Sequence, residues 1–175
     1  MSAIALHNAV AALRALEPTD LDILYRWEND PRVWTASGTL TPYSRQMLWK
    51  YLEDYTGDIF QSRELRLMAV DSDSGEAVGT VDLFNFDPAN NRAELGLLVG
   101  PEHRGRGYAS AMLDLVSDYA RDHLGLRQLY VIITTDNMVC LELFDHHGWQ
   151  RAGTLQSWVR HGRDYTDAIV FQRVF

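Results

Sequence analysis

The feature that most restricts the fold is a segment in which a strand-like run, a glycine-rich loop and an amphipathic helix follow one another directly. Ala93 to Val99 is mostly aliphatic and has the length of a strand. Apolar residues after the loop recur at spacings of three and four: Ala109, Met112, Leu113, Val116 and Ala120. Leu129 to Thr135, rich in β-branched residues, predicts another strand. The chain is therefore expected to contain a strand–helix–strand crossover within a sheet.

The remaining segments predict mostly antiparallel strands. Asp71 to Glu76 has the composition of a turn, and His161-Gly162 closes a hairpin near the C-terminus. The expected strands span residues 10–16, 65–70, 77–86, 93–99, 129–135, 150–160 and 165–174, and helices begin near residues 19, 43, 109 and 137. The predicted class is α/β, with a mixed, mostly antiparallel twisted sheet of about seven strands flanked by about four helices.

Composition and charge limit the function classes. With 46% hydrophobic residues, the chain can build a core without a disulfide or a metal ion. No repeat or linker divides it, so residues 1–175 are expected to form a single domain. Cys140 is the single cysteine and no signal-peptide or membrane-spanning pattern is present, which predicts a cytoplasmic protein. The net charge of −8 disfavours nucleic acid and anionic membranes as partners and favours a cationic or neutral substrate.

The loop between residues 104 and 110 is the strongest candidate for a ligand site. It connects a strand to a helix, so backbone N–H groups and the positive end of the helix dipole converge there. Gly105 and Gly107 allow close approach of the backbone, while Arg104 and Arg106 add positive charge. The Gly-Lys-Ser/Thr ending of nucleotide triphosphatases and the third glycine of a dinucleotide fingerprint are both absent. A pyrophosphate group is the ligand that fits this loop.

Two motifs resemble the GNAT N-acetyltransferase superfamily. Arg104, Gly107 and Ala109 match its Arg/Gln-x-x-Gly-x-Gly/Ala signature. A second motif is similar at Asn137, Leu143-Phe144 and Gly148-Trp149. The resemblance extends over nearly the whole chain and is nearest to spermidine N-acetyltransferases and ribosomal-protein alanine N-acetyltransferases. It implies a GNAT fold and an acyl-CoA-dependent N-acetyltransferase that uses acetyl-CoA.

The same resemblance implies which residues contact the cofactor. Backbone groups of Leu97, Leu98 and Val99 would run beside the pantetheine arm. The pyrophosphate would be held by the loop and the start of the helix, comprising Arg104, Gly105, Arg106, Gly107, Tyr108, Ala109 and Ser110. Asn137 has two interpretations, a contact to the cofactor or a simple helix cap.

A candidate general base lies on the strand Ala93 to Val99. Alternation places Glu94 and Gly96 on the same face, where a glycine leaves room for a ligand beside a carboxylate. Glu94 is therefore the candidate base, with an ion pair to Arg92 or to a neighbouring strand as the alternative. Phe144 occupies the position of the family's acid tyrosine and has no hydroxyl group. Cys140 and His147 lie within about one helical turn and could replace it, although a core role and a surface role are the better explanations.

The acceptor is expected to contact the first two helices. Trp27, Glu28, Asp30 and Trp34 combine carboxylates with aromatic faces that can hold an ammonium group; the alternative is a pair of core aromatics with solvated acids. The predicted acceptor is a primary amine of a polyamine, another small amine or a peptide N-terminus. A noncatalytic acyl-CoA-binding or sensing protein is the other function considered. No metal site is predicted, and the aromatic hairpin at residues 158–165 is a candidate surface for a homo-oligomer.

Overall fold

A computed structural model describes residues 6–175, apart from the side chains of residues 35 and 36. Its centre is a seven-stranded sheet with the order β1-β2-β3-β4-β5-β7-β6. The strands are Ala11–Arg14 (β1), Leu65–Asp71 (β2), Ala77–Asp87 (β3), Arg92–Val99 (β4), Gln128–Thr134 (β5), Gln150–His161 (β6) and Asp164–Val174 (β7). The pair β4–β5 is parallel and the other pairs are antiparallel. The predicted mixed α/β sheet is confirmed.

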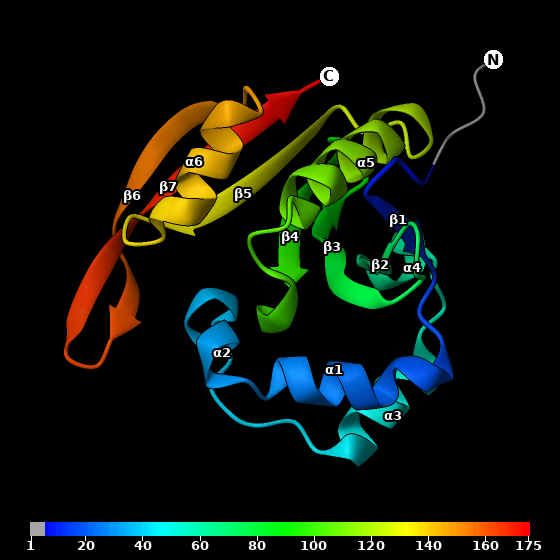
Figure 1. The fold of residues 1–175 in the computed structure, drawn as a ribbon. Helices are drawn as coiled ribbons and strands as arrows, with labels where there is room; N and C mark the ends of the chain where they lie inside the picture. Colours follow the sequence, from blue (N-terminus) through cyan, green and yellow to red (C-terminus); the bar gives the residue numbers. More distant parts are fainter. Residues whose placement is uncertain (1–5) are drawn as a thin grey trace.

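Helices cover both faces of the sheet, as Figure 1 shows. They are Leu21–Glu28 (α1), Pro31–Ser37 (α2), Arg45–Asp54 (α3), Ile59–Ser62 (α4), Tyr108–Asp122 (α5) and Met138–His146 (α6), with 3-10 turns at Pro18–Asp20 (η1) and Pro101–His103 (η2). The helix α5 packs on the main core with strands β1 to β5, whereas α1 packs on the opposite face against Met68 and Val70. No helix among residues 6–175 is long and apolar enough to cross a membrane.

The alternation predicted for β4 is confirmed. Ala93 and Leu95 are buried in the core beneath α5, and Leu97 and Val99 pack against the same cluster. Leu98 faces the other way and packs against the cluster that contains α1. One strand therefore borders both helical layers, and its side chains divide between them.

Within residues 6–175, the helices α2 and α4 were not expected from the sequence. Helix α2 begins where the Asp30 side chain accepts the amide N–H of Arg32, and it ends at Gly38 in the left-handed conformation. Helix α4 begins where Asp58 caps the amides of Phe60 and Gln61. They contain seven and four residues, which is too short for an apolar period to be visible in a sequence. Neither helix was therefore predicted.

Strands β4 and β5 separate partway along their length. Their register consists of Arg92 with Gln128, Ala93 with Leu129 and Glu94 with Tyr130. Beyond Glu94, β4 continues to Val99 beside β3, while β5 continues to Thr134 beside β7. The β5-facing side of β4 therefore has no ladder partner beyond residue 94 within the described part of the chain. This divergence opens at the end of β4 that leads into the glycine-rich loop.

Candidate active site

The glycine-rich loop has the backbone geometry of an anion site. Gly105 and Gly107 have φ values of 75° and 84°, in the left-handed region that glycine adopts most easily. Gly107 is the N-cap of α5, and no side chain caps this end of the helix. The first amide N–H groups of the 15-residue helix thus stay available, at the positive end of its dipole.

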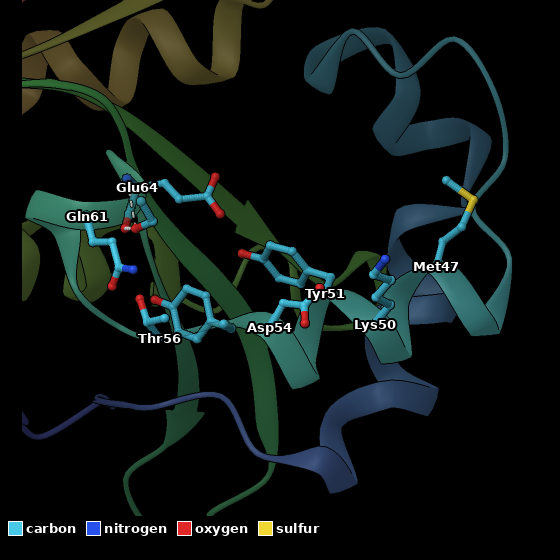
Figure 2. A pocket seen from close by; sticks show the side chains of 9 residues that line it. Met47, Lys50, Tyr51, Asp54, Thr56, Gln61 and Glu64 are labelled. Carbon is cyan, nitrogen blue, oxygen red and sulfur yellow. Dashed lines mark hydrogen bonds between the residues drawn. The ribbon is translucent and has the colours of Figure 1, made fainter.

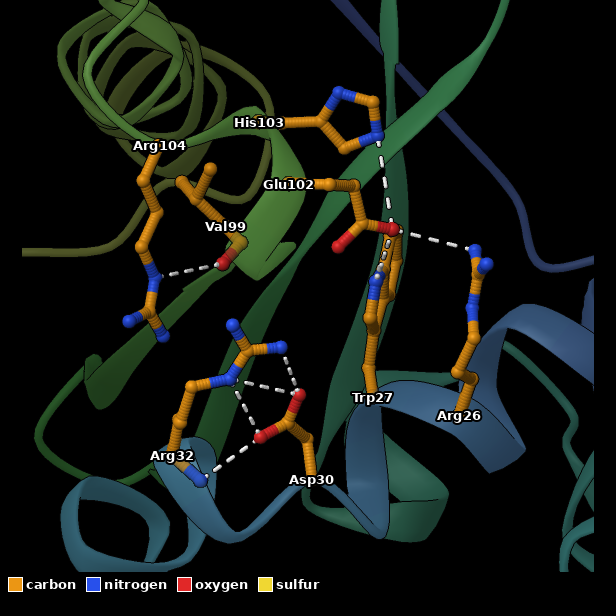
Figure 3. Close-up of polar contacts among 8 residues, drawn as sticks. All are labelled: Arg26, Trp27, Asp30, Arg32, Val99, Glu102, His103 and Arg104. Carbon is orange, nitrogen blue, oxygen red and sulfur yellow. Dashed lines mark hydrogen bonds and ion pairs between the residues drawn. The ribbon is translucent and has the colours of Figure 1, made fainter.

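The two loop arginines are exposed to solvent, whereas the side chain of Tyr108, which follows them, is bonded within the protein. Arg104 is exposed, and its Nε donates to the carbonyl of Val99 at 3.4 Å, which keeps a cation at the end of β4 (Figure 3). Arg106 is exposed as well. The Tyr108 hydroxyl donates to Asp71 at 2.7 Å, and this bond to a carboxylate raises the pKa of Tyr108. Tyr108 therefore anchors α5 to β2 through its side chain, leaving only its backbone for a ligand.

Residues farther along the proposed cofactor path differ in what they offer. The side chains of Leu97 and Val99 pack in the core beneath α5, and that of Leu98 packs toward α1. Only the backbone groups of these residues are therefore left to bind a ligand in the gap between β4 and β5. Ala109 and Ser110 form the first turn of α5. The side chain of Asn137 accepts the amide N–H of Cys140 at 3.3 Å and caps α6. Of its two interpretations, the helix cap is the one present in this structure.

Glu94 lies at the point where β4 and β5 diverge, because Glu94 and Tyr130 form the last register pair of these two strands. Its Oε2 accepts a hydrogen bond from Nδ2 of Asn85 at 2.9 Å. Asn85 has a φ of 50° and lies at an irregularity of β3, which brings it beside Glu94. Arg92, the ion-pair partner considered from the sequence, pairs with Asp87 at 3.1 Å. Burial and the nearby Glu94 carboxylate raise the pKa of Tyr130.

The position of the family's acid tyrosine lies in the core. Phe144 is 3% exposed, and its ring meets Trp149 edge-on at 4.9 Å and Phe171 at 5.9 Å. Burial raises the pKa of the Cys140 thiol, and the opposing effects of Asn137 and Arg104 are smaller. A thiol with a pKa above that of the departing CoA thiol, about 8.5, would transfer its proton uphill. Cys140 therefore makes a poor substitute acid.

His147, the second candidate substitute, lies at the end of α6. Its Nδ1 is 2.8 Å from the carbonyl of Leu143, and its Nε2 is 3.8 Å from a carboxylate oxygen of Asp114 on α5. These contacts are those of a helix-end residue joined to the neighbouring helix.

The two tryptophans that were predicted to contact the acceptor have structural roles. Trp27 is 1% exposed, and its indole N–H donates to Glu102 at 3.3 Å. Trp34 is half-buried and donates to the carbonyl of Glu28 at 2.8 Å. Asp30 pairs with Arg32 at 2.6 Å, and hydrogen bonds from the Arg32 side chain and backbone lower the pKa of Asp30 to about 2. Trp27 is a core aromatic, in agreement with the alternative considered for it, whereas Asp30 keeps a charge near the surface.

Glu28 belongs to a charged cluster that sequence reasoning missed. Its carboxylate pairs with Arg66 at 2.8 Å, and the same guanidinium also pairs with Asp82. Burial opposes the charge of Arg66, but the two carboxylates outweigh this effect and raise its pKa. The cluster carries a net charge of −1, because two carboxylates share one cation. The available signal was the alternation of Arg66 and Asp82 with aliphatic residues in two strands.

The charged cluster lies on the same sheet face as the candidate base. Asp82 is opposite Gly96 in the register, one pair along the β4 face from Phe84 and Glu94. A Cβ atom at Gly96 would lie 3.3 Å from Cε1 of Phe84, 3.4 Å from Cβ of Asp82 and 3.9 Å from Oδ2 of Asp82, so glycine avoids crowding between this ring and the carboxylate. Carboxylates and a small strand residue therefore occupy the face that looks toward α1 and α3.

A surface cavity of about 540 Å³ lies beside this cluster, between α3 and α4 (Figure 2). Tyr51 connects the two, because it lines the cavity and its ring centroid is 5.6 Å from the Arg66 guanidinium. Burial raises the pKa of Tyr51 far above its usual value, so its hydroxyl remains protonated. Asp54 and Glu64 add carboxylates and Lys50 adds a cation to the lining.

Comparison with known proteins places these features in context. The family described as Acetyltransferase (GNAT) domain matches residues 11–159. Spermidine N(1)-acetyltransferase of Escherichia coli K12 is 27% identical over 169 residues, which cover 93% of this chain and 87% of that protein. The enzyme of the same name from Vibrio cholerae is 26% identical over 152 residues, covering 85% of this chain and 83% of its own.

The fold is also shared with solved structures. The crystal structure of a Vibrio cholerae spermidine N-acetyltransferase in complex with CoA and spermine superimposes with a TM-score of 0.85. It is 24% identical and covers 95% of this chain and 96% of the other. The two chains therefore share one fold.

Proposed function

Because the chain belongs to the GNAT acetyltransferase family and is an acyl-CoA-dependent N-acetyltransferase, we propose that it acetylates a primary amine of a cationic acceptor. Acetyl-CoA is the acetyl donor. Polyamines are the first acceptors to test, since the relatives from E. coli and V. cholerae are named for spermidine. Other small amines and peptide N-termini remain alternatives. Residues 1–175 would act as one catalytic domain.

One observation carries the proposal: β4 loses its parallel partner after Glu94 and then leads into a glycine-rich loop at a helix N-terminus. Unpaired strand amides suit the peptide-like pantetheine arm, and the free amides of α5 suit a diphosphate. The two features follow one another along the chain, from the unpaired part of β4 to the loop before α5. The residues present thus fit acetyl-CoA, with Leu97 to Val99 beside the arm and Arg104 to Ser110 around the phosphates.

Glu94 is the proposed general base. An alkylamine has a pKa of about 10, so it arrives as an ammonium ion and must lose a proton before it attacks the thioester. Glu94 lies at the point where the gap opens and is held by Asn85, which fixes its orientation. A carboxylate at this place can take the proton directly or through a water molecule. A backbone N–H near Leu98 would stabilise the oxyanion that forms.

The acceptor would approach from the face of α1 and α3. The cluster of Glu28, Arg66 and Asp82 gives this face a net negative charge beside Gly96. Such a charge favours an ammonium over a neutral or anionic acceptor. Of the four predicted acceptor residues, Glu28 gains the strongest support, and Trp27 and Trp34 act by shaping the wall.

A thiol-release assay over polyamines, aminoglycosides and short peptides tests the proposal. Glu94→Gln should lower kcat by about 100-fold or more and change its pH profile, because a general base typically contributes 10² to 10⁴ in rate. The affinity for CoA, measured by titration calorimetry, should remain unchanged. Glu142→Gln makes the same chemical change at an exposed residue of α6 and should leave turnover intact. CoA binding without turnover on any acceptor would instead favour a sensing protein.

A further inference from the structure

The turn between β4 and the glycine-rich loop is tied to the acceptor-side helix by a single carboxylate oxygen. Oε1 of Glu102 accepts the indole N–H of Trp27 at 3.3 Å and a guanidinium N–H of Arg26 at 3.2 Å (Figure 3). Both donors belong to α1, whereas Glu102 lies in η2, two residues before Arg104. The walls for the two substrates therefore meet at this contact.

Close packing reinforces the contact. A Cβ atom at Gly100 would lie 2.8 Å from three atoms of the Trp27 ring, so only glycine lets the indole reach this place. The Gly100 amide donates to Val78 at 2.8 Å, and its carbonyl accepts the His103 amide at 2.8 Å. The indole is thus clamped between the start of the loop and its own helix, and the Glu102 oxygen fixes its edge.

The Glu102 side chain lies next to the loop, but its carboxylate is directed toward donors of α1. Burial opposes ionisation, but its own backbone N–H, the Trp27 indole and the Arg26 guanidinium together lower the pKa of Glu102. Glu102 is therefore a carboxylate at neutral pH, close to a loop that would bind a diphosphate. Two like charges in contact would repel each other, so this side chain has to point away from the phosphates. Its hydrogen bonds to α1 do this.

We propose that Glu102 is a positioning residue that, through Trp27, fixes the pyrophosphate-binding loop to helix α1. The inference rests on the proposed function and adds a link between its two substrate sites. Loosening the contact lets the loop and α1 move separately, which weakens acetyl-CoA binding and orients the acceptor wall less well. Coupling between two binding sites is reciprocal, so acceptor binding changes the cofactor affinity through this contact by the same factor as cofactor binding changes the acceptor affinity.

The test is a set of matched variants whose CoA affinity is measured by titration calorimetry. Glu102→Leu removes charge and acceptor, and Trp27→Phe keeps an aromatic ring but loses the indole N–H. Each should weaken CoA binding about tenfold, the size of a typical intersite coupling. The double variant should bind CoA no more weakly than the single variant with the lower CoA affinity, because both substitutions break the same contact between Glu102 and Trp27. Glu102→Gln, which keeps an acceptor oxygen, should restore most of the affinity.

The control is Asp145→Leu, which removes an exposed partner of Arg151 at the far end of α6 and should leave CoA affinity unchanged. At saturating acetyl-CoA, kcat of Trp27→Phe should fall less than kcat/KM for acetyl-CoA. If Glu102→Leu does not fold, Glu102→Gln and Trp27→Phe provide the comparison. Unchanged affinity in Trp27→Phe, or additive losses in the double variant, would overturn the inference. Failure of the unmodified protein to bind CoA would overturn the proposed function itself.

Discussion

Replacing Arg66 by methionine probes the charged cluster of Glu28, Arg66 and Asp82 on the proposed acceptor side. The side chain of Arg66 is 23% exposed, those of Glu28 and Asp82 are 11% and 20% exposed, and both carboxylates bind the one guanidinium. Methionine keeps much of the aliphatic stem but leaves two neighbouring carboxylates without a cation. The expected result is a large loss of stability, because the uncompensated charges repel each other and are poorly solvated.

The size of this loss follows from the burial of the partners. Removing one partner of a fully buried ion pair costs about 3–5 kcal/mol, and the partial exposure of these groups places the expected loss near the lower limit, at about 3 kcal/mol. For a chain of this length that corresponds to a decrease in Tm of about 6–12 °C. Arg151→Met breaks an exposed pair with Asp145, so it should cost less than about 1 kcal/mol.

Urea unfolding followed by circular dichroism gives both values under one condition. Adding Glu28→Gln to Arg66→Met should recover about 1 kcal/mol or more, because one unpaired carboxylate is removed. The reasoning would be refuted if Arg66→Met lost no more stability than Arg151→Met, or if the added Glu28→Gln substitution made the protein still less stable.

Two further predictions concern the backbone and the pH dependence. Gly100→Ala should cost about 1–3 kcal/mol in urea unfolding because its Cβ overlaps the Trp27 ring, whereas Gly153→Ala, with no atom within 4 Å of the new Cβ, should be nearly neutral; equal losses would contradict this. Asp30 has a folded pKa of about 2, below the usual 3.8, so its contribution is complete above about pH 4 and is lost as the pH falls toward 2. The difference in free energy of unfolding between the wild type and Asp30→Asn should therefore shrink as the pH falls from about 4 to 2. A difference that stays constant would show that the ionised Asp30 does not stabilise the fold.

The parts of the fold and site that could be predicted are those with a local pattern. The alternation from Ala93 to Val99 gave the two faces of β4 correctly, and the glycines at 105 and 107 marked the loop before α5. These patterns depend on residues close together in the chain. The predicted helix start near residue 19 was also correct to within a turn, since its first residues form η1 before α1.

The unpredicted parts depend on pairing between distant segments. Arg66 and Asp82 meet because β2 and β3 align in one register, and Glu28 joins them from α1. A shift of one residue in that register would have placed the charges on opposite faces; the alternation within each strand shows which face a charge takes, but not which residue of the other strand it meets. Trp27 presents the same difficulty, because its neighbour Gly100 is 73 positions away in the numbering. An aromatic residue in a helix does not reveal which backbone it will cover.

The buried position of Phe144 bears on how the leaving thiolate is handled. Its ring packs between Trp149 and Phe171, so the residue contributes to the core and faces apolar groups. A tyrosine hydroxyl at the same place would need a hydrogen-bond partner or would cost stability. The CoA thiol has a pKa of about 8.5, so its thiolate is a tolerable leaving group near neutral pH and water can protonate it afterwards. The ammonium, with a pKa of about 10, cannot attack until it is deprotonated, so the proton that matters most is the one that the proposed base, Glu94, would remove.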